Sequence, residues 1–139
     1  MNVGYVVNTV FTSRSYILSP DDGMKVWLVD VGDTDRILER ITPGAQVCGV
    51  LLTHAHYDHI YGIPSLLEHW PECRIYTNIP GVDILKDPRK NMSRYHEDPI
   101  SFVSDNVVVV GEGSRIQLFD EVEAEVIETP GHNPSCLSF

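Results

Sequence analysis

The chain has 139 residues, of which 42% are apolar and 22% are charged, enough for one globular domain with a core and unlike disordered or low-complexity proteins. Twenty acidic residues against ten basic ones give a net charge of −10, which disfavours nucleic acid and anionic membranes as partners. No apolar run approaches the roughly 20 residues that cross a bilayer, no signal-peptide pattern opens the chain, and three cysteines lack a C-x-x-C pair, so we expect a cytoplasmic protein.

The first half of the chain alternates strand and helix patterns. Residues 3–10 and 15–19 predict two strands, and a Pro–Asp–Asp–Gly turn leads into a third over 25–31. A short helix is expected over 35–41, and residues 46–53 predict a buried strand with little alternation. A helix over 63–70 has Pro64 in its first turn, and a strand over 73–77 follows. This order predicts an α/β fold.

The second half of the chain has weaker helix and strand patterns. Three prolines interrupt residues 80–103, where we expect short helical turns and loop, and residues 107–110 predict a small strand. Residues 115–119 and 121–128 predict a hairpin whose alternating glutamates face water. Residues 135–139 have strand character. Neither a repeat nor a linker is present, so we expect a single domain over 1–139.

A histidine-rich motif, H-x-H-x-D-H, directly follows the buried strand at residues 54–59. Residues two apart in extended chain point to the same side, so His54 and His56 can converge on one ion and Asp58 continues the alternation. His59 points elsewhere and can serve either a second ion or a different part of the loop. Imidazole and carboxylate ligands suit Zn²⁺, Mn²⁺ and Fe²⁺. The alternative is a polar cluster that caps the helix over 63–70.

A second motif supports a metal site. The sequence T-P-G-H at 129–132 follows a predicted strand and places His132 in a tight turn. Alone it would favour an ordinary loop histidine, but together with the first motif it favours a metal ligand. The remaining histidines, His69 and His96, are predicted to lie outside the ligand set.

With the segments W-L-V-D-V-G-D at 27–33 and D-P-R-K-N-M-S at 87–93, the two motifs resemble the metallo-β-lactamase superfamily, in particular its glyoxalase II-like (hydroxyacylglutathione hydrolase-like) branch. The resemblance implies the N-terminal portion of an αβ/βα sandwich, a mixed β-sheet with flanking helices. It also implies a first metal site of three histidines, a second site that includes Asp58 and His59, and one or two zinc ions, with iron or manganese as alternatives. The first-site ligands would be His54, His56 and His132.

The same resemblance implies a chemistry. In the family's hydrolases a metal-bound hydroxide attacks a carbonyl carbon, and Asp58 is the residue expected to orient or deprotonate that water. The expected substrate is a small thioester or other acyl compound. Tyr61 stands where the family often has glycine, and we expect it either to contact substrate or to pack within the loop.

The pattern departs from the family after His132. A bridging aspartate and a further histidine are expected there, but the seven following residues contain neither, so the resemblance implies a truncated fold and weak turnover by this chain alone. Half a sandwich would leave an apolar sheet face uncovered, through which we expect a homodimer, unless the sequence is a fragment of a longer product. The alternative functions are a non-catalytic metal-binding or self-associating remnant and a mononuclear iron enzyme like the persulfide dioxygenases.

Overall fold

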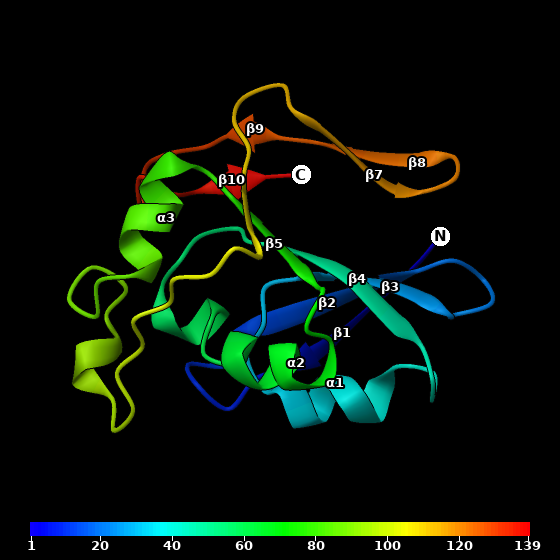
Figure 1. The fold of residues 1–139 in the computed structure, drawn as a ribbon, viewed down its shortest axis with the longest axis horizontal. Helices are drawn as coiled ribbons and strands as arrows, with labels where there is room; N and C mark the ends of the chain where they lie inside the picture. The colour runs from blue at the N-terminus through cyan, green and yellow to red at the C-terminus, as the bar shows by residue number, and fades with distance from the viewer.

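A six-stranded mixed sheet forms the centre of the computed structural model, which describes residues 1–139 (Figure 1). The strands lie in chain order, β1 (Asn2–Val7), β2 (Arg14–Ser19), β3 (Lys25–Val29), β4 (Gln46–Leu51), β5 (Arg74–Thr77) and β6 (Val107–Val109). Neighbours are antiparallel from β1 to β3 and parallel from β3 to β6. Parallel pairs need long crossovers, and the helices supply them. The predicted α/β fold with a mixed sheet and flanking helices is confirmed.

Two helices cover one face of this sheet, α1 (Thr34–Arg40) and α2 (Ile63–His69) (Figure 1). Strand residues Val26, Leu28 and Val50 point into this layer, where they join one buried cluster with Ile37 of α1 and Leu66 of α2. Burying side chains of this size contributes roughly 1.5–3 kcal/mol each. None of the helices has the length and apolar character that a bilayer crossing requires.

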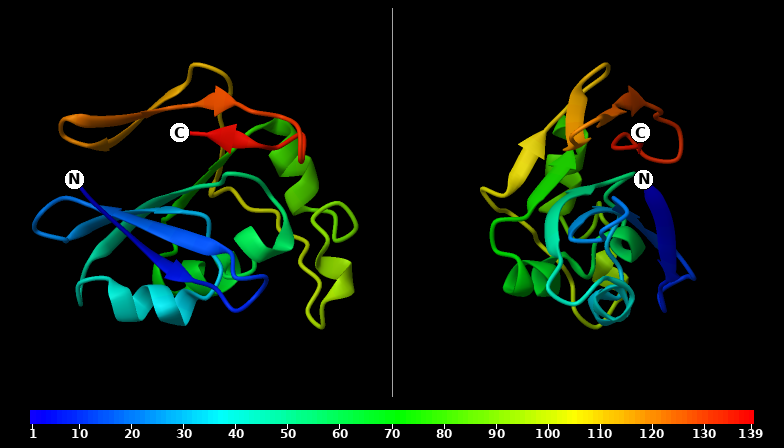
Figure 2. Two further views of the ribbon diagram at one scale, coloured as in Figure 1. Left: turned by 180° about the vertical axis from the view of Figure 1, so that it is seen from behind. Right: turned by 90° about the vertical axis from the view of Figure 1, so that its right-hand side faces the viewer.

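The opposite face of the sheet carries a second layer of short strands, drawn in orange and red above the sheet in the left-hand view of Figure 2. They are β7 (Arg115–Phe119), β8 (Val122–Glu125), β9 (Ile127–Glu128) and β10 (Leu137–Ser138). Trp27 points into this layer and its indole Nε1 donates to the Leu118 carbonyl oxygen at 2.9 Å. The sheet face that we expected to be uncovered is therefore partly covered by the chain's own C-terminal strands. An apolar groove of about 340 Å³ remains between the layers, and self-association through it stays a prediction.

Three predicted segments differ most from the structure. The strand expected over 3–10 ends at Val7, because residues 8–13 form the tip of the β1–β2 hairpin. The helix α3 (Ile79–Leu85) replaces the expected short turns, since Pro80 falls in its first turn and the Asn78 side chain caps it by accepting from the Gly81 backbone N–H at 2.9 Å. The second arm of the predicted hairpin is divided, because β8 pairs with β7 and β9 pairs with β10.

A close approach before α2 fixes the loop that carries the histidines. The Gly62 backbone N–H donates to the Val31 carbonyl at 3.1 Å, and its own carbonyl accepts from the Thr34 hydroxyl at 2.9 Å. A Cβ at this position would overlap the carbonyl oxygen of Gly32, which is backbone and cannot rotate away. Glycine is thus required at position 62 because a side chain would not fit there, and not because the turn needs a positive φ.

We expect Gly62→Ala to lower the free energy of unfolding by about 1–3 kcal/mol, the usual cost of an overpacked site. Urea denaturation measures this. Gly4→Ala is the matched control, since nothing lies within 4 Å of a Cβ built at Gly4. Equal urea midpoints for the two variants would contradict the packing argument.

Candidate metal centre

Two loops that are far apart in sequence meet at one end of the sheet to form the candidate site. His54 and His56 lie in the segment after β4, and His132 lies between β9 and β10. The Leu137 backbone N–H donates to the Thr53 carbonyl at 2.7 Å, and the Ala55 N–H donates to the Ser135 hydroxyl at 3.1 Å. These bonds hold the second loop against the first.

The three imidazoles converge. One ring nitrogen from each of His54, His56 and His132 lies within 4.8 Å of the others. His132 Nε2 lies 3.0 Å from His56 Nδ1, and the Asn133 side-chain amide lies 2.8 Å from His56 Nε2. Such a set of neutral nitrogen donors around one point suits a divalent transition metal ion.

The protonation state of the rings also suits a metal. Burial, together with the neighbouring imidazoles, lowers the pKa of His54 to about 3. Burial and His132 likewise lower the pKa of His56. Neutral imidazole is the form that binds a metal, so at neutral pH these two rings need lose no proton before an ion enters.

Asp58 and His59 lie beside this group and pair with each other. His59 Nε2 lies 3.1 Å from an Asp58 carboxylate oxygen, and the His59 ring centroid lies 4.2 Å from that of His54. Burial alone would lower the pKa of His59, but hydrogen bonds to Asp30 and Asp58 outweigh it and raise the pKa to about 10. Burial would raise the pKa of Asp58, yet the hydrogen bond from His59 leaves it below its usual value.

Asp30 anchors His59 from behind, a role that we did not predict from the sequence. It is only 3% exposed, and its carboxylate accepts from His59 Nδ1 at 2.7 Å. The same carboxylate accepts from the Thr53 backbone N–H at 2.8 Å and from the Thr53 hydroxyl at 2.6 Å. The available signal was an aspartate at the C-terminal end of a strand that neighbours the histidine strand, where open α/β sheets place their ligands.

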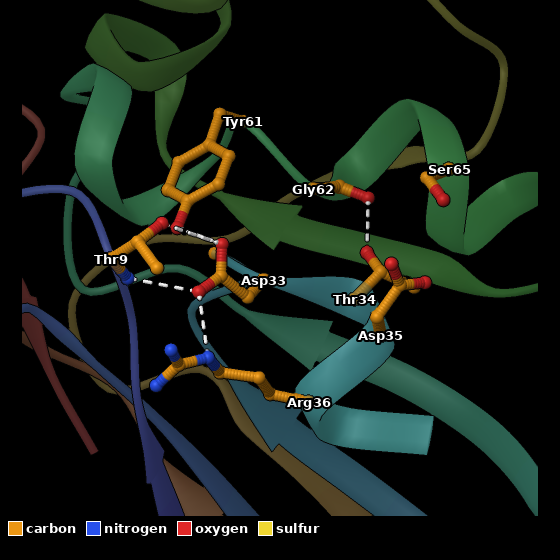
Figure 3. A pocket seen from close by; sticks show the side chains of 9 residues that line it. Thr9, Asp33, Thr34, Asp35, Arg36, Tyr61, Gly62 and Ser65 are labelled. Atoms are coloured by element: carbon orange, nitrogen blue, oxygen red, sulfur yellow. Dashed lines mark hydrogen bonds and ion pairs between the residues drawn. The ribbon is translucent and has the colours of Figure 1, made fainter. Parts of the chain in front are cut away.

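Tyr61 faces away from the histidines. Its hydroxyl donates to the Asp33 carboxylate at 2.6 Å, in a neighbouring pocket of about 370 Å³ (Figure 3). Burial and then Asp33 raise the pKa of Tyr61 to about 12. Asp33 also accepts from the Thr9 backbone N–H at 2.8 Å, so Tyr61 helps to hold the β1–β2 hairpin tip (Figure 3). A contact between Tyr61 and substrate stays a prediction.

The two remaining histidines differ in position. His69 is exposed near the end of α2, with its ring tilted against Trp70. His96 lines the same cleft as the three converging imidazoles, and its ring stacks on Tyr57 with centroids 3.9 Å apart. It is not a member of the converging group.

Comparison with known proteins gives a consistent assignment. The sequence profile of the metallo-β-lactamase superfamily matches residues 8–139. The chain is 34% identical over 123 residues to a hydroxyacylglutathione hydrolase of Xylella fastidiosa (strain 9a5c), covering 88% of this chain and 39% of that protein. It is 32% identical over 124 residues to a protein of the same name from Stenotrophomonas maltophilia (strain R551-3), covering 89% and 40%. The chain therefore spans about two fifths of the length of these relatives.

Solved structures share the fold at lower identity. The B3 metallo-β-lactamase BLEG-1 superimposes with a TM-score of 0.79 at 22% identity, covering 98% of this chain and 65% of that one. TTHA1623, in a di-iron-bound form, gives 0.75 at 24% identity, covering 96% and 64%. ETHE1 from Myxococcus xanthus gives 0.71 at 18% identity, covering 99% and 52%.

Proposed function

The chain belongs to the metallo-β-lactamase superfamily, and on that basis we propose that it is a metal-dependent hydrolase of the glyoxalase II-like kind, acting on a thioester or similar acyl bond. The observation that carries the proposal is the convergence of three imidazoles from two loops. The relatives named hydroxyacylglutathione hydrolase, up to 34% identical, support the choice of a thioester. The chain spans only 39% of that relative's length, so the relative's activity is proposed for this chain and is not inherited from the match alone.

The metal would be held first by His54, His56 and His132, whose nitrogen donors fit zinc, iron or manganese. We propose zinc, with one ion at the three histidines and Asp58 and His59 available to a second. When bound, such an ion supplies hydroxide at neutral pH by lowering the pKa of water to about 7.

The chain's own residues prepare this site in separate ways. Asp58 keeps an ionised carboxylate at neutral pH and can orient a water molecule and accept its proton. Asp30 fixes the His59 ring at Nδ1, so that Nε2 faces Asp58. The Asn133 amide performs the same positioning for His56. Buried partners of this type are known to orient metal-binding histidines.

Thiol release from a hydroxyacyl thioester of glutathione tests the proposal. We expect slow hydrolysis by this chain that depends on added zinc, and a loss of about 100-fold or more in Asp58→Asn, the range typical of a general base. Asp83→Asn, which alters an exposed ion pair with Lys86, is the control. Absence of zinc-dependent thiol release would count against a hydrolase. Bound iron together with oxygen consumption would favour the persulfide dioxygenase-like alternative instead.

The cellular location and the oligomeric state of the protein are also part of the proposal. We propose a cytoplasmic location, because an odd number of cysteines leaves at least one thiol unpaired. We also propose self-association through the apolar groove between the two layers, which sedimentation velocity at micromolar concentration would test.

A further inference from the structure

All the non-glycine residues with left-handed backbone conformation lie around the candidate metal centre. Phe11 and Thr12 have φ of 52°, Asp30 has 61° and Met92 has 68°. Each such residue costs on the order of 1–2 kcal/mol, and strain of this kind collects at functional sites. The left-handed conformation of Asp30 is explained by the hydrogen bond that its side chain makes to His59. The same conformation at Phe11 and Met92 needs a different explanation, because both side chains are apolar and both line the histidine cleft.

Phe11 lies in a hydrogen-bonded hairpin tip. The Asn8 backbone N–H donates to the Ser13 carbonyl at 2.8 Å, and the Asn8 side chain donates to the Ser13 hydroxyl at 3.1 Å. The Ser13 hydroxyl in turn donates to the Asp58 carbonyl at 2.7 Å, which binds the tip to the metal loop. Phe11 is nevertheless 76% exposed. The tip thus holds an apolar ring at the cleft without burying it.

Met92 is presented from the loop that follows α3. Its neighbour Asn91 is buried, accepts from the Tyr57 backbone N–H at 2.8 Å and donates from its side chain to the Ile100 carbonyl at 2.9 Å. The Asn91 side-chain oxygen accepts from the Ser93 N–H at 2.9 Å. Met92 itself is 46% exposed and contributes its side chain to the cleft.

Between these two side chains the cleft offers aromatic surfaces. It measures about 330 Å³, and the Tyr57 and His96 rings stack in its wall at an interplanar angle of 26°. Phe11 meets His96 edge-on, with centroids 5.9 Å apart and planes at 70°. No lysine or arginine lines this cleft, and the His59 ring in its wall is already paired with Asp30 and Asp58.

We propose that Phe11, Met92 and the Tyr57–His96 stack form an apolar clamp that selects acyl compounds carrying an aromatic group next to the reacting carbonyl. Phe11 and Met92 are the specificity-determining residues. The substrate class rests on the proposed hydrolase function, whereas the binding of an aromatic group does not. A ring that enters the clamp gains edge-to-face and sulfur–aromatic contacts and covers the exposed face of Phe11. The hydrogen bonds of Ser13 and Asn91 hold the two strained apolar residues in place beside the metal centre.

A matched pair of neutral probes tests the clamp without turnover. Phenylacetamide and acetamide share the amide and differ only in the aromatic arm. We expect NMR titration of the zinc-loaded chain with phenylacetamide to give saturable shifts at Phe11, Met92 and His96, with a Kd at least about 10-fold lower than for acetamide. Phe11→Ala is expected to weaken phenylacetamide binding by about 10-fold.

Tyr95→Ala is the matched control, because it removes an aromatic ring that is 68% exposed but lies outside the cleft lining. It should bind phenylacetamide as the parent chain does. The proposal is overturned if the two probes bind equally, or if Phe11→Ala and Tyr95→Ala bind phenylacetamide alike. Because no reaction is measured, a clamp that fails this test leaves the hydrolase proposal standing, and a chain without turnover can still show the clamp.

Discussion

Replacing His56 with alanine is expected to remove most of the tightly bound zinc. Both ring nitrogens of His56 are engaged, one with His132 and the other with Asn133, so this ring is central to the converging group. Without it, two imidazoles remain, too few for the three protein ligands of an ordinary zinc site, and the affinity should fall by about 100-fold or more. Elemental analysis after dialysis against a weak chelator measures the zinc retained per chain.

His69→Ala provides the control for this experiment. It also replaces an imidazole by a methyl group, but His69 is exposed on α2 and belongs to no cluster of metal-binding side chains. Its zinc content should match that of the parent chain. Equal zinc in the two variants would remove His56 from the ligand set, and with it the basis of the proposed function.

The sequence predicted the parts of this site that depend on local pattern. The H-x-H spacing in extended chain brings His54 and His56 to one side whatever the rest of the fold does. The T-P-G-H turn restricts the backbone around His132, but its position opposite His56 depends on the backbone bond between Leu137 and Thr53, a long-range contact without a local signal.

Other parts could not be predicted, because they depend on strand neighbours and loop packing. Asp30 reaches His59 only because β3 and β4 are adjacent and parallel. The strand expected over 3–10 extends up to the residue before Phe11, since neither Phe11 nor Thr12 is of a type that favours the left-handed conformation found in the turn after Val7. The Asn8 and Ser13 bonds that impose that conformation are visible only in the folded chain.

Replacing Asp30 with asparagine is expected to weaken zinc binding at His59 by about 10–100-fold, the usual effect of removing a buried partner of a metal-binding histidine. Asparagine keeps the shape and one acceptor for Thr53 but removes the negative charge from His59 Nδ1. The pKa of His59 should then fall from about 10 towards its ordinary value of 6.5. NMR titration of the His59 ring in the metal-free chain measures this directly.

The same substitution changes how stability depends on pH. A histidine whose pKa is raised in the folded state stabilises fully below its unfolded pKa of about 6.5, and that contribution disappears as pH rises through the folded pKa of about 10. As pH rises from about 6.5 to about 10, the free energy of unfolding of the metal-free parent chain should therefore fall by the contribution of His59. The fall should be smaller in Asp30→Asn. Asp33→Asn is the matched control, because this carboxylate binds Tyr61 and Thr9 and has no contact with His59. If both variants kept the parent's titration of His59, the elevated pKa would have to come from Asp58 alone, and Asp30 would serve only to join β3 to Thr53.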